Sequence, residues 1–467
     1  MAGHSHFTPA NVEEFFEFTS TAKKKIFISL AVGIVMFVLG CIFLANGVGE
    51  SHSGASEAHS VAKGAIENVT DNNHKINTES ISSTVENNHA EHAATAVGHH
   101  EYSWTKRLWA NLWLNSVFFA GLAVVGMFFV SLQYLAKAGW SSVIKRVPEA
   151  FPAFLPFVGV LMLVVFIVGG HDLFHWTNEA LYDKSSPEYD KIIDGKKGYL
   201  NTPFYMIRLV LYFCVWYGLW RWLRNKSIQE DELGGTDKFY DMVKIGTGFI
   251  VFFGVTSSTA AWDWTMSIDT HWFSTMFGWY HFASWHVSAY CVITLAVLLL
   301  KDKGYMQYVN DSHLHDLGKF IFGFSIFWSY VWFCQFLLIY YANLPEETIY
   351  FRERWEGHDG VFKTPLILSV LINFLFPLLW FMTRDAKRSA TFMKVGACGL
   401  LVGHYLDFYQ MIMPGTVGKH AGFGLLEFGT IIIFVSVFVY VISVQLTKAS
   451  LVPKNHPFLE EALHHDI

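Results

Sequence analysis

Long apolar stretches of about 20 residues alternate with shorter polar segments along most of this chain. A helix of ~20 residues crosses a hydrocarbon layer of ~30 Å, and these stretches carry almost no charge. The pattern predicts an all-α integral membrane protein with ten transmembrane helices. We place them at Ile26 to Asn46, Asn111 to Tyr134, Phe151 to Gly169, Pro203 to Leu223, Val243 to Trp262, Gly278 to Leu300, Phe320 to Tyr341, Pro365 to Met382, Val395 to Met413 and Leu425 to Leu446.

The distribution of Lys and Arg predicts the orientation of these spans. With the lysines at 23–25 in the cytoplasm, the segments on that side hold more basic residues than those opposite, as the positive-inside rule requires. The ninth span is diluted by Gly403, His404 and Asp407. Without it the later loops would exchange sides, so ten spans with both termini in the cytoplasm is the consistent arrangement.

An internal repeat subdivides the chain. Gly198-Tyr-Leu-Asn-Thr202-Pro203 matches Gly360-Val-Phe-Lys-Thr364-Pro365 at the start of two apolar helices, and Trp262-Asp263-Trp264 resembles Leu406-Asp407-Phe408 one helix later. Proline suits the first helical turn because its missing donor would be unpaired there. We therefore predict two four-helix bundles of like orientation, with one flanking helix at each end.

The predicted domains follow from these spans. They are a cytoplasmic tail (1–25), an anchor helix (26–46), a periplasmic spacer (47–110), the first bundle (111–262), a periplasmic connecting loop (263–277), the second bundle (278–413), the tenth helix (425–446) and a cytoplasmic tail (447–467). The first span follows a basic flank but lacks a small-x-small cleavage site, so we interpret it as a retained anchor. The spacer is rich in His, Ser and Asn, which is typical of a solvated segment, although loose metal binding is an alternative.

Composition narrows the functional classes. The chain is 52% hydrophobic and only 15% charged, with a net charge of −6 and no basic patch that would indicate nucleic acid. Its five cysteines all fall inside predicted spans and form no Cys-x-x-Cys pair. We interpret them as packing residues, and we expect no metal site, iron–sulfur cluster or haem attachment in this chain.

Ionisable residues inside the spans are the first candidates for chemistry, because such groups are expensive in a bilayer. His404 and Asp407 are three residues apart, on one helical face, where an imidazole beside a carboxylate can pass protons. A structural hydrogen bond between helices is the alternative. Arg208 should pair with Asp172 or Asp263, or snorkel to the outer surface, and we favour snorkelling.

Glu427 and His286 are two further candidates for proton transfer. Glu427 begins the tenth span and could simply sit at the interface, whereas His286 lies in the sixth span. His281 and His286 are five residues apart and should face different directions. Because His404 lies at another depth, these histidines make poor axial ligands for haem b.

Two outer loops share a mixture of acids, imidazoles and indoles. One holds His171, Asp172 and His175, and the other holds Asp263 and Asp269. Tryptophans there are expected as interfacial anchors. A quinol headgroup would also need such bases together with an aromatic wall, so these residues and Arg208 are candidates for a quinone site.

The Thr-Pro helix entries, the two bundles and the run Trp262-Asp-Trp-Thr-Met-Ser-Ile-Asp-Thr-His-Trp-Phe-Ser-Thr-Met-Phe-Gly278 resemble the polysulfide-reductase-type membrane subunits. The ten-helix form is most similar to the second such subunit of alternative complex III, a bacterial quinol:cytochrome c oxidoreductase. The resemblance implies the bacterial inner membrane and quinol (menaquinol or ubiquinol) oxidation at the periplasmic side. In that family a histidine and an aspartate contact the quinol, chiefly in the sister subunit. His171, Asp172, Asp263 and His404 are the comparable positions here.

The same resemblance implies partners that carry all the redox centres. These are a sister membrane subunit, an iron–sulfur subunit, c-type cytochrome subunits with haem c, and a terminal oxidase as a further partner. This chain would then bind no redox cofactor and would support quinol oxidation or proton transfer. The alternatives are a structural scaffold in the same complex, or a secondary transporter with a midplane site.

Overall fold

The computed structural model describes residues 13–46 and 103–466. Residues 1–12 and most of the predicted spacer therefore lie outside the described residues. Within the described ranges the chain folds into helices and forms no strands. The helices are α1 (Ser20–Ala45), α4 (Trp104–Leu135), α5 (Arg146–Ala150), α6 (Leu155–Leu173), α7 (Lys191–Gly195), α8 (Thr202–Leu233), α9 (Asp237–Trp264), α10 (Met276–Asp302), α11 (Asp311–Ala342), α12 (Pro345–Trp355), α13 (Lys363–Val370), α14 (Phe376–Trp380), α15 (Arg384–Arg388), α16 (Ala390–Thr416), α17 (Leu425–Leu446) and α18 (Leu459–Leu463).

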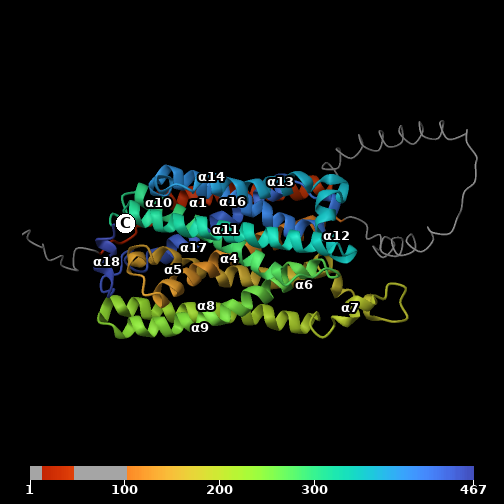
Figure 1. The fold of residues 1–467 in the computed structure, drawn as a ribbon, viewed down its shortest axis with the longest axis horizontal. Helices are drawn as coiled ribbons and strands as arrows, with labels where there is room; N and C mark the ends of the chain where they lie inside the picture. The colour runs from red at the N-terminus through yellow and green to blue at the C-terminus, as the bar shows by residue number, and fades with distance from the viewer. Residues whose placement is uncertain (1–12, 47–102, 467) are drawn as a thin grey trace, which may run out of the picture.

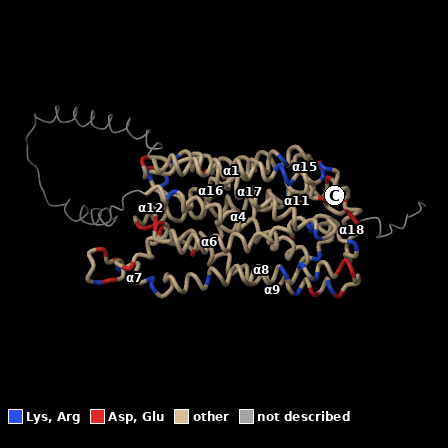
Figure 2. Tube along the Cα trace, turned by 180° about the vertical axis from the view of Figure 1, so that it is seen from behind, with Lys and Arg blue, Asp and Glu red and all other residues tan. Residues whose placement is uncertain are grey.

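The long helices run side by side along one direction (Figure 1). We call the end with residues 13–19 and 447–466 the tail end, and the end with α7 and α12 the loop end. At the tail end the backbone N–H of Leu451 donates to the carbonyl of Glu14, which joins the two terminal segments. Lys, Arg, Asp and Glu gather at both ends and leave a long uncharged middle (Figure 2). This is the charge distribution of a multi-pass membrane protein.

Nine helices in the described ranges are long and apolar enough to cross a membrane. They coincide with nine of the predicted spans. The remaining one, α16, is a helix of 27 residues, but it is not among the nine. Its polar residues His404, Asp407 and Gln410 are buried among apolar ones such as Leu400 and Phe408, so its inward face is mixed.

Helix α4 is the centre of the molecule. In its most apolar stretch of 18 residues, 94% of the residues are buried inside the protein. The helix packs against α6, α9, α10, α16 and α17. Its length is hydrophobic on every side, which is typical of a helix surrounded by protein. Next to it lies α10, in whose most apolar stretch of 18 residues 78% of the residues are buried. This helix contacts α9, α11 and α16. These two helices form the core on which the others pack.

The eighth predicted span is not one regular helix. Residues Leu371–Leu375 form a π-helical turn between α13 and α14, and Pro377 follows directly. Proline removes one backbone donor and crowds the preceding turn, which explains why the regular helical ladder changes here. Single π-helical turns within α-helices occur frequently at functional sites. The third predicted span likewise begins with short turns, at α5 and at residues 151–154, before α6.

Glycines allow the first and last membrane helices to meet. A Cβ at Gly40 of α1 would collide with the backbone of Leu426 in α17, and a Cβ at Gly429 of α17 would collide with that of Phe37. Small residues at helix interfaces permit such close approach in membranes. Only 11% of the apolar window of α1 is buried, so this contact holds the helix to the rest of the protein.

We predict that Gly40→Val separates α1 from α17 and destabilises the protein by about 1–3 kcal/mol, as overpacked interfaces do. Thermal unfolding of the purified chain in detergent measures this. Gly218→Val is the matched control, because Gly218 also lies in a long helix but a Cβ there meets no atom within 4 Å. Equal midpoints for the two variants would contradict the predicted packing.

Candidate functional site

Asp407 lies at the centre of a buried polar cluster formed by three helices. Its carboxylate accepts hydrogen bonds from the hydroxyl of Tyr280, from Oγ of Ser284 at 2.5 Å and from Nε1 of Trp328 at 2.9 Å. Tyr280 and Ser284 belong to α10, and Trp328 belongs to α11. All four side chains are buried. Three donors on two helices thus stabilise a carboxylate within the apolar core.

His404 stands beside this carboxylate without a hydrogen bond to it. Its Nδ1 lies 3.9 Å from Oδ2 of Asp407, beyond the usual hydrogen-bond range. The imidazole is fully buried and packs edge-on against Trp328. Neither ring nitrogen has a hydrogen-bond partner among the described residues. The predicted proximity is therefore confirmed, and the direct hydrogen bond is not formed.

The π-helical turn brings a second unpaired polar group to the same place. Asn373 lies in that turn, is fully buried, and makes no side-chain hydrogen bond within the described part of the chain. A Cβ at Gly403 would collide with Oδ1 of Asn373, so this glycine gives the amide its room. Buried polar groups are normally satisfied, and the exceptions often mark function. His404 thus adds hydrogen-bonding capacity next to Asp407, and Asn373 adds it against Gly403, one residue before His404.

Arg208 forms a buried ion pair, which corrects our preference for snorkelling. Its Nε donates to Oδ2 of Asp263 at 2.7 Å and its Nη2 donates to Oδ1 at 2.9 Å. The guanidinium also packs on the ring of Tyr199 at 4.0 Å, and Tyr212 donates to the same carboxylate at 3.2 Å. Arg208 is 6% exposed and Asp263 is 1% exposed. A bidentate pair stabilises both charges better than partial hydration at a membrane surface would.

Glu427 is buried in a contact between two helices. It accepts from Nε of Arg107 at 2.7 Å and from Nδ2 of Asn111 at 3.0 Å, and it is 1% exposed. Its other oxygen accepts from the backbone N–H of Gly424 at 2.7 Å, which caps the start of α17. The carboxylate therefore joins α4 to α17. Its geometry favours a structural role.

The other predicted loop residues are dispersed over the loop end. Nδ1 of His171 lies 3.0 Å from the hydroxyl of Thr177, and Asp172 accepts from Thr105 at 3.3 Å. His175 is exposed. Asp269 instead pairs with Arg354 of α12 at 3.2 Å, an arginine that is 1% exposed. The structure thus brings Asp263 together with Arg208 and places Asp269 at another arginine.

The two histidines of α10 have different surroundings, as the sequence predicts. Nε2 of His281 lies 3.2 Å from the hydroxyl of Thr265. Nδ1 of His286 lies 2.7 Å from the carbonyl of Phe282, and its ring stacks on Phe324. The Nε2 atom of His286 has no hydrogen-bond partner in the described ranges. Among the described residues no group of three or more His, Cys, Asp or Glu side chains is arranged to hold a metal ion.

Sequence reasoning missed a buried ionic cluster at the tail end. Lys145 pairs with Glu230 at 2.7 Å, and Glu149 forms ion pairs with both Arg146 at 3.2 Å and Arg224 at 3.1 Å. These five side chains are at most 3% exposed. In the sequence, the charged residues at the end of α8 and before α6 resemble those of solvated helix ends. The two basic residues at 145 and 146 followed by the acidic residue at 149 are the signal that could have indicated a cluster.

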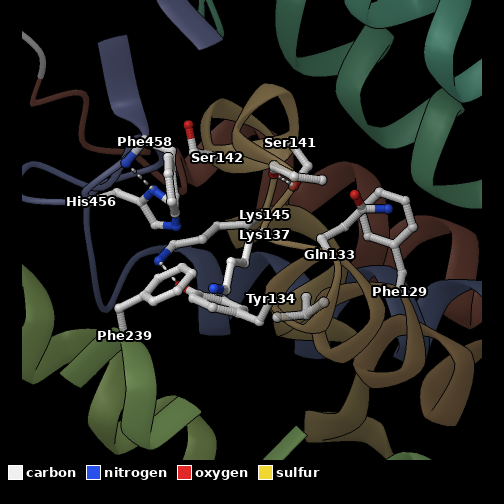
Figure 3. A pocket seen from close by; sticks show the side chains of 12 residues that line it. Phe129, Gln133, Tyr134, Lys137, Ser141, Ser142, Lys145, Phe239, His456 and Phe458 are labelled. Atoms are coloured by element: carbon white, nitrogen blue, oxygen red, sulfur yellow. Dashed lines mark hydrogen bonds between the residues drawn. The ribbon is translucent and has the colours of Figure 1, made fainter. Parts of the chain in front are cut away.

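The C-terminal segment covers this cluster. Figure 3 shows His456 and Phe239 around Lys145 and Tyr134. Nδ1 of His456 accepts from the backbone N–H of Phe458 at 3.2 Å, so the imidazole is held as its neutral form. Burial, together with the charges of Lys145 and Arg146, keeps the pKa of His456 well below its ordinary value of 6.5.

Comparison with known proteins adds no relative: no family model matches the chain, and no curated protein matches it. The residues and their geometry therefore carry the functional argument alone.

We predict that Arg208→Gln destabilises the protein by about 3–5 kcal/mol, because it leaves the buried carboxylate of Asp263 unpaired. The double variant Arg208→Gln with Asp263→Asn removes both charges and should recover much of that loss. Chemical or thermal unfolding in detergent of the wild type, the two single variants and the double variant gives the coupling energy between the two residues. Additive effects of the two substitutions would contradict a buried ion pair.

We also predict that acid destabilises the tail end through His456. In the unfolded chain this imidazole binds a proton as the pH falls below 6.5, whereas the folded protein holds it neutral, so stability is lost on that side. The loss is at most about 1.4 kcal/mol per pH unit. Unfolding midpoints at pH 7.5 and 5.5 should differ less in His456→Gln than in the wild type.

His464→Gln is the control, because His464 is exposed on the same segment. It should keep the wild-type pH dependence. The same pH dependence in His456→Gln would show that His456 is not held neutral.

Proposed function

We propose that this chain is the membrane subunit of a quinol:cytochrome c oxidoreductase of the alternative complex III type, in which it transfers protons. The observation that carries the proposal is Asp407, a buried carboxylate with His404 at 3.9 Å. Intramembrane ionisable residues are rare and mark proton relays and ion pathways. The unpaired ring nitrogens of His404 add sites through which a proton can pass, and the unpaired amide of Asn373 lies against the neighbouring Gly403.

The proposed arrangement in the membrane has ten spans, α16 included. The tail end then lies in the cytoplasm of a bacterium and the loop end lies in the periplasm. Two four-helix bundles would consist of α4, α6, α8 and α9, and of α10, α11, α13–α14 and α16. Helix contacts within each set support this division, and the contacts of α4 with α10 and α16 join the two sets. The repeated Thr-Pro entries begin α8 and α13.

Quinol oxidation releases two electrons and two protons, so the reaction needs an electron path and a proton path. In the proposal the iron–sulfur and haem c partners supply the electron path. This chain supplies proton-accepting groups: Asp407 and His404 in the second bundle, and Asp263 at the end of the first. Asp263 is already engaged in the ion pair with Arg208.

A transporter is the second candidate, because the π-helical turn interrupts a membrane helix beside the polar cluster. Transporters build their sites on such interrupted helices near the midplane. Solute uptake by the isolated chain in liposomes would favour this function. The redox proposal expects no uptake.

Asp407→Asn should lower quinol oxidation by the native complex by about tenfold or more, since the amide cannot exchange the proton that the carboxylate does. His404→Gln should lower it as well. The rate of acceptor reduction by the purified complex measures both. Asp302→Asn is the control, because Asp302 is half-exposed at the end of α10 and pairs with Lys394.

The amount of assembled complex is measured in parallel. Reduced assembly with normal turnover per complex would favour a purely structural scaffold. Normal assembly and normal turnover in Asp407→Asn would refute proton transfer through this cluster.

A further inference from the structure

A groove of about 500 Å³ opens on the outer side of α11, away from the polar cluster. Its wall on α11 consists of residues at i, i+1, i+4, i+5 and i+8, which is one face of a helix over two turns. Phe282 of α10 completes it. The α11 residues are Lys319, Phe320, Gly323, Phe324 and Phe327. Four phenylalanines and one lysine thus line a cavity that faces the hydrocarbon region.

A glycine on α11 leaves the space of the groove free of side chains. Gly323 contributes no side chain, and a Cβ at this position would meet no atom within 4 Å. Behind the groove, the ring of His286 lies 3.8 Å from Phe282 and 5.0 Å from Phe324. These stacked rings make a firm wall. Such a surface accepts an apolar chain and offers it no hydrogen-bond partner along its length.

The end of the groove nearest the tail end is positively charged. Lys319 is half-exposed there and forms an ion pair with Asp316 at 2.5 Å. α15 packs against this part of α11, and a Cβ at Gly318 would collide with the side chain of Lys387. Lys319, Lys387 and Arg384 all act electrostatically on His315, against the single carboxylate of Asp316. Asp316, whose carboxylate also lies 2.8 Å from Nε2 of His465, is one negative charge beside these three positive ones.

We propose that this groove is a binding site for an anionic phospholipid, with one acyl chain along the phenylalanines and the phosphate beside Lys319. Basic residues at the end of an apolar groove between membrane helices recognise phospholipid headgroups by charge. A quinone is the less suitable occupant, because its two ring oxygens need polar partners on both sides. Within the described ranges Lys319, at one end, is the only polar side chain that lines the groove.

The test is native mass spectrometry of the full chain in detergent, titrated with phosphatidylglycerol or with phosphatidylcholine of the same acyl chains. The wild type should bind phosphatidylglycerol about fivefold more tightly, the preference that one lysine near an anionic headgroup provides. Gly323→Leu fills the groove and should weaken phosphatidylglycerol binding by about tenfold, because the acyl chain is no longer buried. Lys319→Gln should remove the preference for phosphatidylglycerol and leave phosphatidylcholine binding unchanged.

Matched controls exclude general effects on the detergent-solubilised chain. Gly248→Leu places the same side chain on another exposed helix position that has no atom within 4 Å, and Lys394→Gln removes another ion-paired lysine. Both should bind phosphatidylglycerol as the wild type does. Two results would overturn the proposal: wild-type binding by Gly323→Leu, or displacement of phosphatidylglycerol from the wild type by decylubiquinone, which would assign the groove to a quinone.

Discussion

Within a bilayer no bulk water can solvate polar side chains, so each polar group on an inward helix face requires a partner from another helix. The arrangement of this protein follows from that requirement. Asp407 of α16 takes its donors from α10 and α11, Asp263 of α9 pairs with Arg208 of α8, and Glu427 of α17 pairs with Arg107 of α4. Apolar packing alone would define the rotation of each helix about its axis only weakly, because a leucine side chain is as stable in lipid hydrocarbon as it is in a protein interior.

Much of the fold could be predicted because long apolar runs have few alternatives in structure. All ten predicted spans are helical, and the weakest, α16, is not among the nine apolar ones because polar residues such as His404, Asp407 and Gln410 dilute its hydrophobicity. An apolar stretch of sequence ends at the edge of the hydrocarbon layer, whereas the helix that contains it can continue beyond that edge. α8 therefore continues about three turns beyond the predicted end at Leu223, through the buried charges of the tail end.

The candidate site could be predicted only in part. Spacing on one helix placed His404 next to Asp407, but the donors Tyr280 and Trp328 come from other helices, which spacing along α16 does not report. Snorkelling was the wrong choice for Arg208, because its distance from Asp263 depends on how α8 packs on α9. Asn373 was missed for a related reason. A lone amide in an apolar run has no pattern, and the π-helical turn that presents it arises in the folded helix.

Two polar regions thus have distinct roles in this account. The ion pairs at Arg208, Glu427 and the tail end join opposite charges and fix helix positions, whereas Asp407 has beside it an imidazole, His404, whose two ring nitrogens have no hydrogen-bond partner among the described residues. Excess hydrogen-bonding capacity beside a buried carboxylate is what proton movement requires.

The most direct measurement is purification of the tagged full-length chain from native membranes in mild detergent, followed by absorption spectroscopy and subunit identification. The account predicts a stable assembly that contains c-type haem, an iron–sulfur subunit and a second, related membrane subunit, and that oxidises added quinol. A chain that is purified alone, without haem or quinol oxidation, from membranes that retain intact respiratory complexes would contradict it.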